Sequence, residues 1–135
     1  MIVEDYTPDY YQNRLGAPLP STYAGKFVHI VGPADEYLVL SPTELTEFHA
    51  QIVQRFSRRR PDTSSVFLPS GEVRFGTPGW SVRGGGHFQL NRAGNCLALW
   101  GASKAYGAFD GDYVRVVLGQ NADWLHYEIA LGQPD

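Results

Sequence analysis

Apolar and polar positions alternate along several segments of the chain, which is the pattern of strands with one buried face. Residues 26–31 alternate well enough to predict a strand, and the apolar residues 37–40 predict a second, with turn residues between them. Further short strands are expected over 66–68, 72–75, 80–83 and 87–90, separated by turns rich in Gly, Pro or Asn. Strands over 95–100 and 125–131 complete the set.

One segment has the spacing of a helix instead. Its apolar positions are Leu45, Phe48, Ile52, Val53 and Phe56. Ser41, Pro42 and Glu44 match a capping box with proline at the first helical position, so the helix is predicted to begin there. The arginine run 58–60 followed by Pro61 predicts its end. A shorter helix is predicted over 112–118, closed by Gly119.

This order of elements predicts an α/β (α+β) domain, with one long and one short helix packed on a mixed or mostly antiparallel sheet. A length of 135 residues fits a single compact domain. Residues 1–25 are rich in tyrosine and proline and lack periodicity, so we expect an N-terminal arm without regular structure. The arm is expected to pack along the domain formed by 26–135; contact with a partner protein is the alternative.

Charge and composition restrict the kinds of partner. There are 11 Lys and Arg and 14 Asp and Glu, so the net charge is −3 and gives no overall attraction to nucleic acid or to an anionic membrane. No apolar run approaches the roughly 20 residues of a membrane span, and the first residues lack the pattern of a signal peptide. The single cysteine, Cys96, fits a reducing compartment. We therefore expect a cytoplasmic monomer.

Two segments have compositions that suggest ligand binding rather than simple packing. The apolar run 97–100 leads directly into the loop 101–107, whose small residues leave backbone N–H groups open while Lys104 adds positive charge. This combination suits an anion such as phosphate, although the spacing is that of neither a P-loop nor a nucleophile elbow. Three consecutive glycines, 84–86, indicate either a flexible turn or a close approach of the backbone to another segment or a ligand.

His49 falls within the apolar arc of the predicted long helix, at about 100° per residue. Two interpretations follow from that position. The first is a hydrogen-bonded core histidine, and the second is a catalytic base at the edge of the core. The histidines do not have the spacing of a metal motif, so neither a metal nor another cofactor is expected.

Four segments in order resemble the Janus/Ocnus family, over roughly residues 26–131. They are Lys26-Phe27-Val28, Glu47-Phe48-His49-Ala50, the glycines 84–86, and Trp100 with the loop 101–107. The resemblance implies a metal-free phosphatase acting on a histidine-phosphorylated protein or another small phosphoramidate. It makes His49 the general base that activates water.

The resemblance also implies a binding set for the phosphoryl group. Ser103, Lys104 and Ala105 would present backbone N–H groups, with the Ser103 hydroxyl, to its oxygens. Lys26 would add charge, and Gly86 belongs to the same set.

The family has arginines where this chain has Ser41 and His87, with Arg83 a candidate substitute for the second. These departures keep open a non-catalytic module that binds phosphate, another anion or a protein. The segment between His49 and Gly84 is longer than in the family, which indicates an added hairpin.

Overall fold

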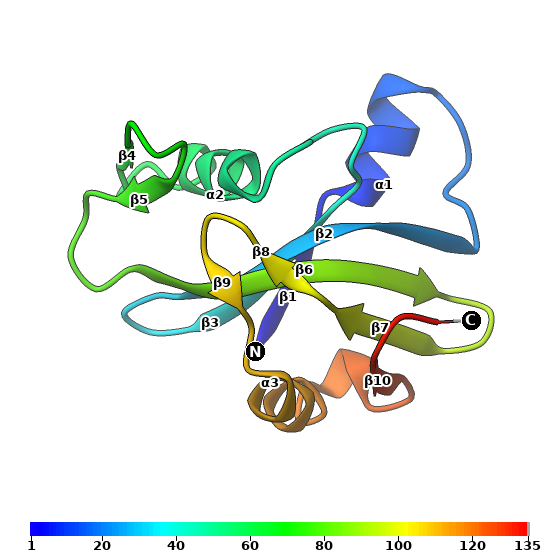
Figure 1. Ribbon diagram of the computed structural model, residues 1–135. Coiled ribbons are helices and arrows are strands. Elements are labelled where there is room, and N and C mark those ends of the chain that lie inside the picture. Colours follow the sequence, from blue (N-terminus) through cyan, green and yellow to red (C-terminus); the bar gives the residue numbers. More distant parts are fainter. Residues whose placement is uncertain (135) are drawn as a thin grey trace.

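A mixed β-sheet forms the centre of the computed structural model, which describes residues 1–134 (Figure 1). Its main path runs in the order β1–β3–β2–β6–β7–β10, with antiparallel pairs in the middle and a parallel pair at each edge. These strands are β1 (Ile2–Asp5), β2 (Thr22–Val31), β3 (Glu36–Ser41), β6 (Ser81–Asn91), β7 (Cys96–Trp100) and β10 (Glu128–Leu131). The predicted α+β class with a mixed sheet is confirmed.

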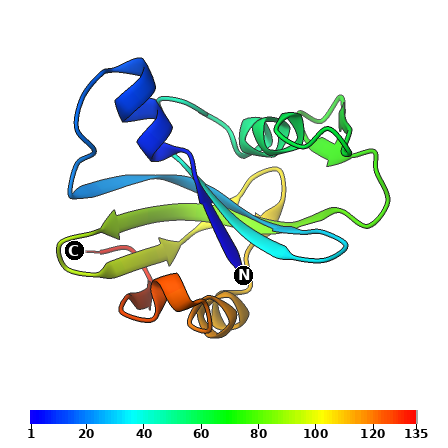
Figure 2. The ribbon, with the colours of Figure 1, turned by 180° about the vertical axis from the view of Figure 1, so that it is seen from behind.

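Helices cover both faces of this sheet. Helix α2 (His49–Arg58) lies over one face and α3 (Gly111–Leu118) over the other, as the two opposite views show (Figures 1 and 2). Neighbouring residues of β2 enter different cores: Val28 packs with the α2 cluster and Phe27 with the α3 cluster. This division follows from the alternation of side chains along a strand. No helix within residues 1–134 has the length and apolarity to cross a membrane.

The long helix begins later than its sequence predicts. Strand β3 extends through Ser41, which pairs with Lys26 of β2, so Ser41 cannot cap a helix. The Ser41 side chain is buried and its hydroxyl accepts a hydrogen bond from Thr46 at 2.5 Å. Helix α2 starts only at His49, and the predicted capping box is wrong because sheet pairing overrides it. The end of the helix at the arginine run is confirmed, as is the short helix α3.

The three glycines lie inside one long strand. Strands predicted separately over 80–83 and 87–90 are parts of β6, which pairs with β2 along most of its length. The register shifts between His29 and Ile30 of β2, which pair with Gly84 and Val82 and leave Arg83 as the extra residue of a bulge. The glycines therefore mark a close approach of backbone, not a turn.

Residues 1–25 have more regular structure than predicted. Strand β1 pairs with β3, and the short helix α1 (Thr7–Asp9) continues into a π-helical turn, Tyr10–Arg14. Strand β2 then runs across the boundary between residues 25 and 26. The expected packing is confirmed: Tyr6 is buried, and Glu4 forms an ion pair with Arg60 at 2.6 Å. The expectation of no regular structure is wrong because Ile2–Asp5 complete the edge of the sheet.

A hairpin outside the main sheet follows α2. Its strands, β4 (Ser65–Phe67) and β5 (Val73–Phe75), pair only with each other. Between β7 and α3, the short strands β8 (Ala102–Ser103) and β9 (Gly107–Ala108) enclose the turn that carries Tyr106. The Tyr106 hydroxyl donates to the Val73 carbonyl at 2.7 Å and accepts from the Val73 N–H at 3.1 Å. The hairpin is thereby attached to the loop 101–107.

The substitution Tyr106→Phe removes both of these hydrogen bonds and leaves backbone groups of the buried Val73 without partners. We expect the free energy of unfolding, measured by urea denaturation, to fall by about 1–3 kcal/mol. Tyr113→Phe is the control, because the Tyr113 hydroxyl contacts Glu36 at the protein surface. An equal change in both variants would contradict a structural role for the Tyr106 contacts.

Candidate functional site

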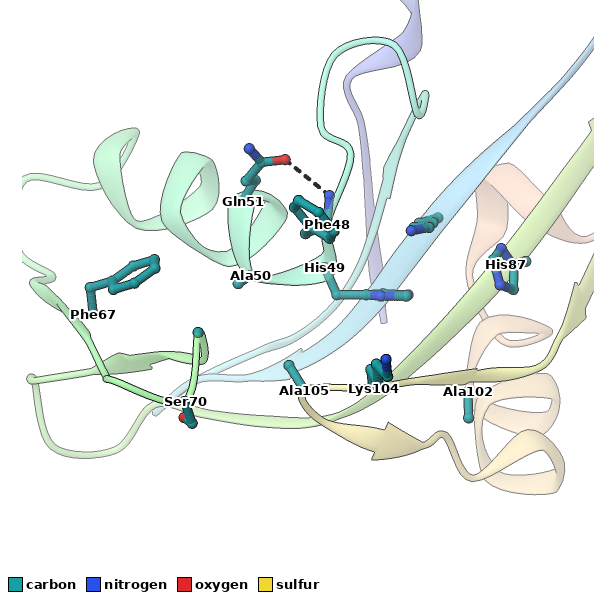
Figure 3. Close-up of a pocket in the computed structure, with 12 residues that line it drawn as sticks. Phe48, His49, Ala50, Gln51, Phe67, Ser70, His87, Ala102, Lys104 and Ala105 are labelled. Carbon is teal, nitrogen blue, oxygen red and sulfur yellow. Dashed lines mark hydrogen bonds between the residues drawn. The ribbon is translucent and has the colours of Figure 1, made fainter.

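A cavity of about 680 Å³ opens between the start of α2, the loop 101–107 and the β4–β5 hairpin (Figure 3). Its lining residues are Lys26, Phe48, His49, Ala50, Gln51, Phe67, Ser70, Gly71, His87, Ala102, Lys104 and Ala105. This lining contains two lysines and two histidines and has no carboxylate and no arginine. A local positive potential is therefore present on a chain of net charge −3.

His49 is the first residue of α2, and its side chain points towards the sheet. Only 7% of the residue is exposed, and Nε2 lies 2.8 Å from the Gly86 carbonyl oxygen. A carbonyl can only accept, so Nε2 carries the proton and Nδ1 keeps its lone pair. Nδ1 has no hydrogen-bond partner in the described residues, and it is not among their fully buried unpaired atoms. It is thus available to a molecule in the cavity.

The surroundings of His49 keep its ring neutral. Burial lowers its pKa below the usual 6.5, although the hydrogen bond to Gly86 acts in the opposite direction. The positive charge of Lys26 and the neighbouring His87 lower this pKa further. At pH 7 the imidazole is therefore a free base, as a general base must be.

Gly85 makes the position of His49 possible. A Cβ atom at Gly85 would lie 2.5 Å from the Phe27 carbonyl oxygen and 3.0 Å from Cδ2 of His49. It would also lie 3.3 Å from Cβ of Ser103. The helix, the central strands and the loop 101–107 therefore meet where β6 has no side chain.

The loop 101–107 contributes both charge and free donors. Lys104 and Ala105 line the cavity, and their backbone N–H groups have no hydrogen-bond acceptor within residues 1–134. Ser103 is buried and does not line the cavity. Its hydroxyl instead accepts a hydrogen bond from the Tyr106 N–H at 3.1 Å, which shapes the turn.

Lys26 lies between Ser41 and His87 in the sheet. It pairs across the sheet with Ser41 on one side and with His87 on the other. Its Nζ atom donates to the Glu47 carbonyl at 2.7 Å and lies 5.8 Å from the centre of the Phe48 ring. These contacts hold the ammonium group near the first residues of α2.

His87 is the cavity residue whose place the sequence does not reveal. Its ring stacks on Trp100 with centroids 6.0 Å apart, and its centroid is 6.2 Å from that of His49. Gly101, at φ 78°, leaves room for it, since a Cβ there would be 2.9 Å from Cδ2 of His87. Two-residue periodicity from Gly85 places His87 on this face, but only once the glycines are known to be strand.

Two other residues predicted for the site, Gly86 and Arg83, do not line the cavity. Gly86 contributes its carbonyl oxygen to His49 and does not line the cavity. Arg83 lies away from the cavity, in a surface depression with His29 and Tyr113, because the bulge turns it to the α3 face. The β4–β5 hairpin reaches the site through Phe67, Ser70 and Gly71.

Comparisons with known proteins do not name the site. No family model matches the chain, and a search of curated proteins finds no match. Within residues 1–134, no three His, Cys, Asp or Glu side chains are grouped as metal ligands would be.

The substitution Gly85→Ala tests the close approach. The new Cβ cannot fit beside the Phe27 carbonyl without a shift, so we expect a loss of about 1–3 kcal/mol in the free energy of unfolding. A movement of the His49 ring by about 1 Å would lower any activity that depends on it about 100-fold. Gly111→Ala is the control, because its Cβ meets only movable Leu131 methyl groups and Phe109. Unchanged stability and activity in Gly85→Ala would contradict this account.

Proposed function

We propose that the protein is a phosphohistidine phosphatase-like hydrolase, with the site arrangement of the Janus/Ocnus family and no requirement for a metal. One observation carries the proposal: His49 presents an unprotonated nitrogen in a cavity that holds Lys26 and Lys104 and has no carboxylate in its lining. The proposed substrate is a histidine-phosphorylated protein or another small phosphoramidate. The proposed setting is the cytoplasm, where the protein acts as a monomer, without nucleic acid or membrane.

The phosphoryl group binds where charge and donors converge. Lys26 and Lys104 attract its oxygens, and the backbone N–H groups of Lys104 and Ala105 donate to them. These donors are fixed before the substrate arrives, so they stabilise the charge that develops on phosphorus-bound oxygens without reorganising. Phosphoryl transfer depends mainly on such positioning and charge stabilisation.

The chemical step uses His49 and a water molecule. Nδ1 takes a proton from the water as the water oxygen attacks phosphorus. The P–N bond breaks, and its electron pair goes to the leaving nitrogen. The departing imidazole is neutral when its other nitrogen already carries a proton. Inorganic phosphate then leaves, and His49 returns its proton to the solvent.

A non-catalytic module that binds phosphorylated or anionic partners is the second candidate. The observation that favours it is the absence of arginine from the cavity lining. Ser41, at one family arginine position, is fully buried and bonded to Thr46. A bidentate contact to phosphate is therefore missing, which weakens substrate binding more than it affects the base.

The first experiment follows phosphate release from a histidine-phosphorylated protein in the presence of EDTA. We expect turnover by the wild type and a 10²- to 10⁴-fold loss of kcat in His49→Ala, roughly the contribution of a general base. His126→Ala is the matched control, because His126 is exposed and outside the cavity. Binding of the phosphoprotein by folded wild type without any turnover would favour the binding module.

The pH dependence of kcat/KM provides a separate test. Because the pKa of His49 is lowered, the base stays unprotonated at pH values where an ordinary histidine is charged. We expect the midpoint of the acidic limb to lie below pH 6.5 after correction for the titration of the substrate itself. Lys26→Gln removes a charge that lowers this pKa, so the limb moves to higher pH. A limb above 6.5 in the wild type would contradict the assignment.

A further inference from the structure

Two large aromatic side chains are exposed at the same cavity. Phe48 is 58% exposed and Phe67 is 68% exposed, and both line it. They come from different elements: Phe48 precedes α2, and Phe67 ends β4. Each of them can contact a ligand that enters the cavity.

Phe67 and the charged residues occupy different parts of this cavity. Figure 3 shows Phe67 at one end, with His87 at the other and Lys104 between them and below the helix. The hairpin also supplies Ser70 and Gly71, so the end beside Phe67 is built by residues that carry no charge. A ligand that fills the whole cavity must therefore be anionic at one end and apolar at the other.

The two ends are held at a fixed spacing. Tyr106 belongs to the same turn as Lys104 and Ala105, and its hydroxyl makes both hydrogen bonds to Val73 of β5. The hairpin that carries Phe67 is consequently attached to the loop that carries the positive charge. Such preorganisation favours a ligand whose anionic and apolar parts have a matching separation.

The size of the cavity exceeds what a phosphoryl group needs. A volume of about 680 Å³ is typical of sites that hold whole drug-sized ligands. The remaining space can receive what is attached to the phosphoryl group. Because the phenylalanines are exposed at the surface, they can contact residues beside a phosphorylated histidine on a polypeptide.

We infer that Phe67, at the uncharged end of the cavity, selects phosphohistidine carried on a polypeptide next to an apolar or aromatic residue. This inference rests on the proposed function and narrows its substrate to such peptides. The positive end, where Phe48 lies beside Lys26, binds the phosphoryl group, and Phe67 binds the flanking side chain. A small phosphoramidate ion uses only the positive end and gains nothing from the aromatic surface.

The test compares two phosphohistidine peptides that differ only in the neighbouring residue, leucine or serine, with phosphoramidate ion as the small substrate. We expect the wild type to have a KM about tenfold lower for the leucine peptide. In Phe67→Ser this preference disappears, and the advantage of the leucine peptide over phosphoramidate ion shrinks with it. Val66→Ser is the matched control: Val66 is 50% exposed on the same strand and does not line the cavity. Phe67→Leu, which keeps an apolar side chain, is expected to retain the preference.

The outcomes separate this inference from the proposed function. Turnover that is lost in His49→Ala but shows no preference between the peptides would overturn the inference and leave the phosphatase intact. Equal preferences in Phe67→Ser and Val66→Ser would also overturn it. If the wild type turns over none of these substrates, the inference is tested instead by the binding of non-hydrolysable phosphonate peptides with leucine or serine beside the phosphonate. A leucine preference that Phe67→Ser abolishes then supports the inference alone, and equal binding overturns it.

Discussion

The contact between the His49 ring and the backbone of β6 is the constraint on which the rest of the site depends. Gly85 lets the ring come close to the strand, and the Gly86 carbonyl then fixes its tautomer through Nε2. The absence of a side chain at Gly85 also leaves room for Ser103, so the start of α2 and the loop 101–107 meet at this point of the strand. A side chain at that position of β6 would separate His49 from the loop residues to which we assign anion binding.

Burial gives this site its chemical character. It lowers the pKa of His49, so that a histidine in a positive environment remains a base at neutral pH. Lys26 and His87 act in the same direction, since they disfavour a further positive charge. Positive charge in the cavity and a neutral imidazole are therefore compatible, and both arise on a chain whose net charge is negative.

Local patterns predicted much of this structure, and long-range pairing explains the rest. Alternation located β2 and β3, and Gly119 marked the end of α3. The start of α2 could not be predicted, because Ser41 fits a helix cap locally but pairs with Lys26 across the sheet. His49 was singled out by its place in the helical pattern and by the family resemblance, Lys26 by the resemblance alone, and both line the cavity. The position of His87 depends on the glycines being strand, and that of Arg83 on a bulge, neither of which a local pattern reveals.

The hairpin after α2 has a consequence for how such a protein can diverge. Its strands pair only with each other, so its sequence can vary without altering the hydrogen bonding of the central sheet. Its tip nevertheless lines the cavity, close to the catalytic centre we propose. Descendants of one ancestor can thus acquire new target preferences by exchanging this short segment, while the residues to which we assign the chemical step stay under separate selection.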